Sequence, residues 1–261
     1  MKNRITQLLS RQGKGILSMY YTAGFPGIND TGTIAKALDT AGADIIEIGI
    51  PYSDPVADGP TIQASNTVAL KNGMRLSTLL KQVKEVRPTI DAPIILMGYI
   101  NPVLQYGFEK FARDAADAGV DGVIIPDMPM DEYLAGYKDL FDSLNLSNTF
   151  LISPTTSEER IRKIDSVTNG FIYAVSATSI TGAKGKFESH QLDYFDRLRN
   201  MKLNNPYLIG FGISNRETFV TASNYGAGAI VGSAFVDLLK NSKDLTADIT
   251  SFVHSLKSNS N

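Results

Sequence analysis

Eight short apolar segments recur along the chain, and each one ends in or next to glycine, proline or aspartate. Most of them carry apolar residues at consecutive positions, which is typical of parallel strands that are covered on both faces. The pattern therefore predicts eight strands, at residues 16–24, 44–51, 93–99, 122–127, 148–154, 171–176, 207–213 and 229–234.

Segments with helical spacing of apolar residues lie between these strands. Clear examples are residues 31–42, 107–119, 131–144 and 157–167. Three helical segments end in glycine just before the next strand, which predicts glycine C-caps at Gly42, Gly119 and Gly226. Two further helical stretches stand outside the repeat: an opening amphipathic helix at 3–12 and a longer insertion at 61–88, after the second strand.

The strand and helix patterns alternate eight times without a composition break or a low-complexity linker. This order predicts an α/β protein with one domain, residues 1–261, folded as a (β/α)8 TIM barrel with an extra N-terminal helix and an insertion after strand 2. The alternative is a doubly wound open sheet. Against it, the segment "YTAGFPG" after the first strand lacks the G-x-G-x-x-G spacing of a dinucleotide-binding turn.

Composition narrows the classes of function. The 261 residues are 43% hydrophobic and 20% charged, as expected for a globular protein with a well-buried core. The formal net charge is -2 and Lys and Arg form no dense cluster, so we expect no nucleic-acid partner. The start of the chain does not read as a signal peptide, and no apolar run approaches the roughly 20 residues of a membrane span. We therefore expect a cytoplasmic protein without a membrane partner.

The residue inventory also limits the chemistry. There is no cysteine, which excludes disulfides and thiol catalysis, and the two histidines, His190 and His254, are far apart in sequence. We therefore expect no metal site. No predicted strand carries a lysine that could form a Schiff base. Carboxylates remain as the groups for proton transfer.

Glu47 interrupts the apolar strand "DIIEIGIP". Alternation along the strand places Glu47 and Gly49 on one face and three isoleucines on the other. The isoleucine face suits packing against helices, so we expect Glu47 inside the barrel near its mouth, with Gly49 leaving room above it for a ligand. The alternative is a structural ion pair, although no predicted strand carries Lys or Arg. Asp54 and Asp58 follow in a loop where aspartates also commonly brace turns.

Glycines at the ends of the last strands predict an anion site. Gly212 lies in "GFGIS" after the seventh strand, and Gly232 and Ser233 lie in "VGSA" after the eighth. Glycine lets backbone N–H groups approach an anion, and a helix beginning at Ser233 would direct its positive end there. Gly182, in "TSITGAKG" after the sixth strand, is a third candidate. The alternative is that these glycines form tight turns only. With an acid pair, such a site favours acid–base chemistry on a phosphorylated small molecule, such as isomerisation or carbon–carbon cleavage.

The motifs together resemble the tryptophan synthase α chain family. The matching segments run in order and in register from about residue 15 to 240: "YTAGFP", "EIGIPYSDPVADGPTIQ", "IPDMP", the "TG" of the sixth loop, "GFGIS" and "VGSA". The resemblance implies a barrel that cleaves indole-3-glycerol phosphate to indole and glyceraldehyde 3-phosphate. It also implies a β-chain partner in an α2β2 heterotetramer, with pyridoxal phosphate held only by the partner and no cofactor in this chain.

The resemblance also implies roles for individual residues. Glu47 matches the acid–base that protonates indole C3 and takes the proton of the side-chain hydroxyl, and Asp58 matches the acid that accepts the indole N–H. The other matched positions are substrate-binding: Tyr20 and Tyr99 beside the indole, Tyr173 and Phe211 near the ligand, Thr181 as the link from the sixth loop to Asp58, and Gly182, Gly212, Gly232 and Ser233 around the phosphate. Ala177 departs from the family pattern, which has Arg there.

Two other functions stay open on the sequence. One is a stand-alone lyase that releases indole and needs no docking surface. The other is a phosphate-binding barrel that acts mainly as an activating subunit, for which a damaged acid pair would be expected. Apolar loop residues in "PYSDPV" and "NPVLQYGFEKF" favour a partner-binding face, although such residues also pack under loops.

Overall fold

The computed structural model describes residues 3–176 and 185–258. All eight predicted strands are present, each shorter than its apolar segment, and the fifth is divided in two. The strands are β1 (Ile16–Thr22), β2 (Ile45–Gly49), β3 (Ile94–Met97), β4 (Gly122–Ile124), β5 (Ser147–Thr149), β6 (Leu151–Ile152), β7 (Ile172–Val175), β8 (Tyr207–Gly210) and β9 (Gly228–Val231).

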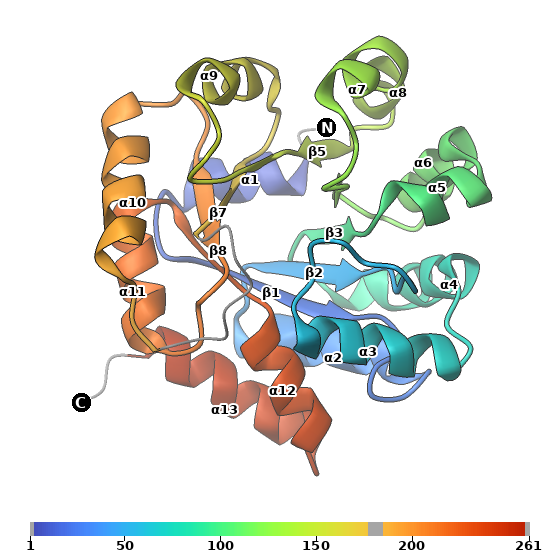
Figure 1. Cartoon of the computed structure of the whole chain (residues 1–261). Coiled ribbons are helices and arrows are strands. Elements are labelled where there is room, and N and C mark those ends of the chain that lie inside the picture. Colours follow the sequence, from blue (N-terminus) through green and yellow to red (C-terminus); the bar gives the residue numbers. More distant parts are fainter. Residues whose placement is uncertain (1–2, 177–184, 259–261) are drawn as a thin grey trace.

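The strands form one parallel sheet in the order β5, β4, β3, β2, β1, β9, β8, β7, β6 (Figure 1). Its two end strands, β5 and β6, are halves of one chain segment separated by Phe150. β5 pairs with β4 and β6 pairs with β7, so this segment joins the two ends of the sheet into a barrel. The predicted (β/α)8 barrel is confirmed, and the doubly wound open sheet is wrong.

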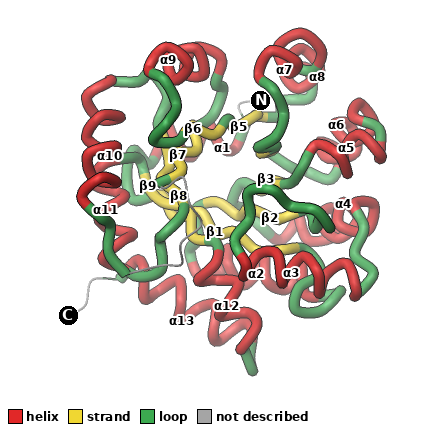
Figure 2. The backbone as a smooth tube through the Cα atoms, in the orientation of Figure 1, coloured by secondary structure: helices red, strands yellow, loops and turns green. Residues whose placement is uncertain are grey.

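Helices surround the strands in a continuous outer layer, red around yellow in Figure 2. They are α1 (Arg4–Arg11), α2 (Asp30–Ala41), α3 (Pro60–Lys71), α4 (Leu76–Val86), the 3-10 turn η1 (Arg87–Thr89), α5 (Ile100–Tyr106), α6 (Phe108–Asp117), α7 (Met130–Gly136), α8 (Lys138–Ser143), α9 (Glu158–Val167), α10 (Ser189–Met201), α11 (Arg216–Tyr225), α12 (Ser233–Asn241) and α13 (Leu245–Lys257).

The extra N-terminal helix and the insertion after the second strand are confirmed, the latter as α3, α4 and η1. The helix predicted at 131–144 is in fact two helices, because the backbone at Tyr137 leaves helical geometry (φ -127°, ψ -21°). The Tyr137 ring stacks on Phe108 with ring centroids 3.6 Å apart. This contact with α6 favours the break over a continuous helix.

Two of the three predicted glycine caps have the left-handed backbone that is typical of such caps. Gly42 has φ 92° and Gly119 has φ 83°. Gly226 is also the C-cap of α11, as predicted, but its φ is -109°, so it caps the helix without the left-handed backbone. A Cβ at Gly226 would lie 2.7 Å from the carbonyl oxygen of Tyr207. Glycine is therefore required there for close approach of two backbones and not for a left-handed turn.

The barrel has an inner and an outer apolar cluster. Ile45 belongs to the inner cluster, whereas Ile46, Ile48 and Ile50 belong to the outer one with the surrounding helices. The predicted alternation along β2 is thus confirmed, and it turns Glu47 inward. Ile5 and Leu8 of α1 also belong to the inner cluster, so α1 covers the amino-terminal end of the barrel.

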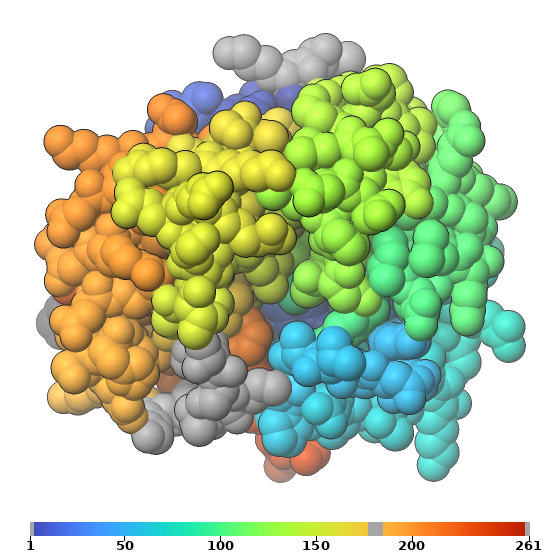
Figure 3. Space-filling model, turned by 45° about the horizontal axis from the view of Figure 1, so that its top comes forward, coloured from blue at the N-terminus to red at the C-terminus, as the bar shows by residue number. Residues whose placement is uncertain are grey.

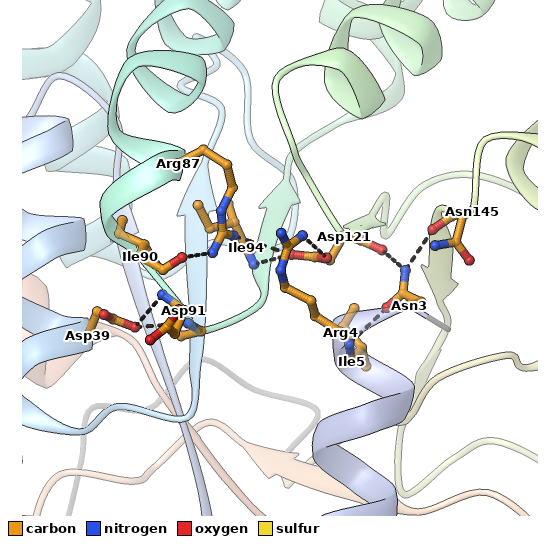
Figure 4. Close-up of polar contacts among 11 residues, drawn as sticks. Asn3, Arg4, Ile5, Asp39, Arg87, Ile90, Asp91, Ile94, Asp121 and Asn145 are labelled. Carbon is orange, nitrogen blue, oxygen red and sulfur yellow. Dashed lines mark hydrogen bonds and ion pairs between the residues drawn. The ribbon is translucent and has the colours of Figure 1, made fainter. Parts of the chain in front are cut away.

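Polar contacts fix α1 to the ends of the neighbouring strands (Figure 4). The Asn3 side chain caps the helix by accepting from the Ile5 N–H, and it donates to the carbonyl oxygens of Asp121 and Asn145 at 2.6 and 2.7 Å. The Asp121 carboxylate is buried and bonds to Arg4 at 3.1 Å and to Arg87 at 3.4 Å. The amino-terminal end of the barrel is therefore closed by a network of charged and polar groups centred on the buried Asp121 carboxylate.

Candidate active site

A cavity of about 520 Å³ lies at the carboxyl-terminal ends of the strands. It is the end at which barrels of this kind hold their active sites. In Figure 3 the middle of the face shown is hollowed beside the light-blue segment that follows β2. The cavity is lined from three sides, by Tyr20, Met97, Tyr173 and Ile230 of the strands, by residues 58–62 after β2, and by residues 211–214, 232–234 and 237 after β8 and β9.

Glu47 of β2 is completely buried. The Ser18 hydroxyl donates to Glu47 Oε1 at 2.6 Å, and among the described residues Oε2 has no hydrogen-bond partner. Burial raises the pKa of Glu47 to about 7, and the Ser18 hydrogen bond partly opposes that rise. None of the ion pairs among residues 3–176 and 185–258 includes Glu47, so the structural ion-pair interpretation is not supported.

The space above Gly49 is filled by a side chain of the protein itself. A Cβ at Gly49 would lie 2.3 Å from the Tyr20 hydroxyl oxygen. The expectation that this glycine leaves room for a ligand is therefore wrong. Gly49 accommodates the ring of Tyr20, which leans across from β1 and lines the cavity.

Asp58 lies in the loop between β2 and α3 and is half-buried at the cavity wall. Asn66 of α3 donates to its Oδ2 at 3.3 Å, and the Gln63 amide donates to its backbone carbonyl at 2.7 Å. Burial raises the pKa of Asp58, whereas hydrogen bonds from Tyr99 and Asn66 act in the opposite direction. The start of α3 at Pro60 adds the positive end of a helix, which favours the ionised carboxylate.

Tyr99 lies behind this loop and does not line the cavity. Its hydroxyl accepts from the Ala57 N–H at 2.9 Å and also hydrogen-bonds to Asp58. Its ring lies 5.4 Å from that of Tyr52. The structure thus brings Tyr99 to the loop that carries Asp58, and not to the surface of the cavity.

The glycine-containing ends of β8 and β9 meet at one side of the cavity. Phe211 and Gly212 have successive positive φ angles, 69° and 75°. The Ser176 hydroxyl donates a hydrogen bond to the Phe211 carbonyl oxygen at 2.7 Å. Gly232 is the N-cap of α12 and has no side-chain cap, while Ser233 begins the helix. Backbone N–H groups and the positive end of α12 therefore face the cavity, an arrangement suited to an anion.

Tyr173 lines the cavity together with the loop that carries Asp58 and the glycine-containing ends of β8 and β9. It is buried on β7, and its ring meets Phe211 edge-on at 6.4 Å. A Cβ at Gly210 would lie 2.4 Å from the Tyr173 hydroxyl oxygen, so Gly210 gives this ring its space. Burial, followed by the charge of Glu47, raises the pKa of Tyr173 well above its usual value, and burial raises that of Tyr20 as well. Both phenols stay neutral and form apolar walls with a hydroxyl donor.

The structure thus gathers Asp58, Tyr20, Tyr173 and the described residues of the predicted anion site around one cavity. Glu47 does not line the cavity, but it interacts electrostatically with Tyr20 and Tyr173, which do. Thr181 and Gly182 lie outside the described residues, as does Ala177. Sequence reasoning missed Ser18 and Asn66. Ser18 alternates with Tyr20 along β1 and shares its inward face, so the strand pattern held a signal for it. No local pattern marks Asn66, because its role depends on where α3 lies.

Residues 3–176 and 185–258 contain no group of three or more His, Cys, Asp or Glu side chains that could hold a metal ion. Within the same residues, no helix combines the length and the apolar character that crossing a membrane requires.

Sequence comparisons match one family, the tryptophan synthase alpha chains, along nearly the whole chain. Residues 6–260 match the family model described as "Tryptophan synthase alpha chain". The tryptophan synthase alpha chain of Flavobacterium psychrophilum is 54% identical over 234 residues, which cover 90% of this chain and 92% of that one. The alpha chain of Parabacteroides distasonis is 51% identical over 255 residues, covering 98% and 99% of the two chains.

Solved structures give the same result. The tryptophan synthase subunit alpha of Legionella pneumophila superposes with a TM-score of 0.88 at 33% identity, covering 98% of this chain and 97% of that one. Tryptophan synthase of Mycobacterium tuberculosis, in an aminoacrylate-bound form, gives a TM-score of 0.85 at 29% identity, covering 97% and 98%. Because the family model, close relatives and solved folds all span nearly the full length, this chain belongs to the tryptophan synthase alpha chain family.

Proposed function

We propose that this chain is a carbon–carbon lyase that cleaves indole-3-glycerol phosphate to indole and glyceraldehyde 3-phosphate, with Glu47 and Asp58 as its acid–base pair. The observation that carries the proposal is Glu47: a fully buried carboxyl next to the cavity-lining Tyr20 and Tyr173, with a pKa raised to about 7 and one oxygen that has no hydrogen-bond partner among the described residues. A group with such a pKa can both give and take a proton near neutral pH.

The reaction needs one proton to move from oxygen to carbon. Glu47, in its neutral form, gives its proton to indole C3. The resulting carboxylate takes the proton of the adjacent side-chain hydroxyl, the carbon–carbon bond breaks, and the hydroxyl carbon becomes an aldehyde. Glu47 ends in the neutral form in which it began, so the proton balance closes without a cofactor in this chain.

Asp58 has the complementary role. Protonation at C3 leaves a positive charge on the indole ring, and we assign Asp58 to accept the indole N–H and to stabilise that charge. Burial raises the pKa of Asp58, and three features of its surroundings act against that rise and favour the ionised form: the hydrogen bonds from Tyr99 and Asn66 and the nearby start of α3. The two acids thus occupy environments of different polarity, as a division into a proton carrier and a charge stabiliser requires.

The phosphate of the substrate is assigned to the glycine-containing end of the cavity. The loop after β8, with Gly212, and the start of α12, with Gly232 and Ser233, supply N–H groups and a hydroxyl. We assign the indole ring to the side lined by Tyr20 and Tyr173, which are neutral and largely apolar. Tyr99 is assigned to this subsite only indirectly, through the loop that carries Asp58, and Thr181 and Gly182 keep the roles that the family resemblance implies.

A barrel that only activates its partner is the less favoured function. Such a subunit would have no use for a buried carboxyl with a raised pKa, which costs stability. Asp58 lines the cavity and Glu47 interacts with the cavity-lining Tyr173, so the acid–base interpretation accounts for more of the site.

We propose a tryptophan synthase β chain as the partner, in an α2β2 heterotetramer in which only the β chain holds pyridoxal phosphate. Two apolar side chains support docking at the carboxyl-terminal end: Val56 is 80% exposed and Leu104 is 50% exposed. They lie on neighbouring segments, because Asn101 of α5 donates to the Tyr52 hydroxyl at 3.0 Å. A stand-alone lyase would have no need for such exposure. We expect the complex to act in the cytoplasm.

The acid pair is tested by Glu47→Gln and Asp58→Asn, which keep the side-chain shapes but remove proton exchange and charge. We expect kcat for indole release to fall by about three or more orders of magnitude in each, with substrate binding by calorimetry largely kept. Asp54→Asn is the matched control, because Asp54 lies in the same loop and is exposed. Near-normal turnover in Glu47→Gln would contradict the proposal, as would an equal loss in the control.

A further inference from the structure

Ser18 makes the only hydrogen bond to the Glu47 carboxyl among the described residues. Both side chains are completely buried, so water does not compete for the contact. Ser18 belongs to β1, and its register partner on β2 is Ile45, two positions before Glu47. The serine therefore holds the carboxyl from the adjacent strand, on the side of the amino-terminal end of the barrel.

The contact distinguishes the two carboxyl oxygens. Oε1 accepts the Ser18 proton at 2.6 Å, whereas Oε2 has no partner among residues 3–176 and 185–258. In the neutral acid the proton resides on one oxygen, and the other remains an acceptor. Oε1 keeps accepting from the Ser18 hydroxyl in both protonation states when the exchanged proton is carried by Oε2; a proton on Oε1 would force Ser18 to turn from donor to acceptor.

We propose that Ser18 is a positioning residue for the reaction: it fixes the Glu47 carboxyl through Oε1 and thereby assigns proton exchange to Oε2. The inference rests on the proposed acid–base function of Glu47 and adds to it a residue that orients the acid and selects the reactive oxygen. An alanine at this position would pack equally well in an apolar strand but would leave both oxygens equivalent and unheld.

Among the described residues, Ser18 is the one hydrogen-bond donor to the Glu47 carboxyl. Two titratable groups interact electrostatically with Glu47: Tyr20 of β1 and Tyr173 of β7, both neutral. The charge of Asp58, in the loop after β2, also raises the pKa values of these two tyrosines. No Lys, Arg or His side chain forms an ion pair with Glu47 among the described residues. The hydrogen bond from Ser18 is therefore the local contact that favours the charged form of the carboxyl.

The test compares Ser18→Ala with Ser18→Thr, which keeps a hydroxyl. The titration of Glu47 is followed by the infrared carbonyl band of its neutral form. This band is assigned to Glu47 because it should be absent from the spectrum of Glu47→Gln. Loss of a donor disfavours the charged form, so in Ser18→Ala we expect the midpoint to move upward by about one pH unit and kcat to fall about tenfold. The alkaline limb of the pH profile of kcat should shift upward by the same amount as the midpoint of the band. Ser18→Thr should restore both the midpoint and kcat.

Ser65→Ala is the matched control, because Ser65 is also buried and hydroxyl-bonded, to Thr22 at 2.6 Å, without contact to Glu47. Its loss should leave the Glu47 midpoint unchanged. The thermal unfolding midpoint of each variant, compared with that of the wild type, tests whether the fold is kept.

The outcomes separate this inference from the proposed function. An unchanged midpoint and an unchanged pH profile in Ser18→Ala would overturn the role of Ser18, even if Glu47→Gln is inactive. A fall in kcat without any movement of the midpoint would also overturn it, since a purely structural effect would give that result. If Glu47→Gln remains active, the acid–base function fails instead, whatever the band does.

Discussion

Glu47 gives the stability of the protein a dependence on pH. Its pKa rises from 4.5 to about 7 on burial. Between these values the folded protein holds a proton that the unfolded chain has released. Stability therefore falls as pH rises through this window, and the full loss, about 3 kcal/mol, is reached above pH 7. The group proposed to perform the chemistry thus destabilises the fold under the conditions in which it works.

We predict that Glu47→Gln removes this dependence. The free energy of unfolding of the wild type should fall relative to that of the variant by about 2 kcal/mol between about pH 5 and about pH 8. Urea unfolding of both proteins at several pH values measures the difference. Other titrating groups affect both proteins alike and cancel in the comparison. A difference that stays constant with pH would mean that the folded-state pKa of Glu47 is not raised.

At the residue scale the sequence predicted positions better than contacts. The inward orientation of Glu47 follows from the isoleucines that alternate with it, and that prediction is confirmed. The bond from Ser18 and the filling of the space above Gly49 by Tyr20 depend on the register between β1 and β2. Register is set by the whole sheet and is not encoded within either strand alone.

The element that closes the amino-terminal end, α1, is held by charges far from the cavity. Asp121 and Arg87 form an ion pair whose side chains are 5% and 8% exposed, and the same carboxylate bonds to Arg4 and to the Ile94 N–H (Figure 4). Removing one partner of a buried pair leaves the other charge without compensation. The network is therefore expected to contribute to stability and not to catalysis.

We predict that Asp121→Asn lowers the free energy of unfolding by about 3 kcal/mol, because Arg87 would remain buried without its counter-charge. Urea unfolding measures the loss. The KM for substrate should stay unchanged, since the network lies at the opposite end of the barrel from the cavity. Asp117→Asn is the control: its pair with Lys84 is about two-thirds exposed, and its loss should cost less than about 1 kcal/mol. Equal losses in the two variants would contradict the prediction.

At the element scale, periodicity was sufficient for the strands. All eight apolar segments form strands, because buried parallel strands need continuous apolar character that few other elements share. The breaks were not predictable. The fifth strand divides at Phe150 because its halves pair with different neighbours, and the helix predicted at 131–144 breaks where Tyr137 stacks on Phe108. Both breaks come from tertiary contacts that local propensity does not contain.

At the scale of the whole molecule, the two ends of the barrel are built differently. The amino-terminal end is closed by α1 and a network of polar and charged groups. The carboxyl-terminal end holds the cavity, the Glu47 carboxyl, whose Oε2 has no hydrogen-bond partner in the described part of the chain, and the backbone with positive φ angles. Stabilising contacts and functional groups thus lie at opposite ends, so the loops at the carboxyl-terminal end can serve both substrate and partner.

We predict that the β chain docks on the carboxyl-terminal end of the barrel through the exposed side chain of Leu104. Leu104 is 50% exposed on α5, which the Asn101–Tyr52 hydrogen bond ties to the loop after β2. Leu104→Gln keeps a good helix former but makes the exposed position polar, so it should weaken β-chain affinity about tenfold while the indole-releasing rate of the isolated chain stays unchanged. Val220→Gln, at a 37% exposed position on α11, is the control and should not affect the affinity. Calorimetric titration with a β chain measures both. Equal affinities for wild type and Leu104→Gln would mean that this surface does not carry the partner.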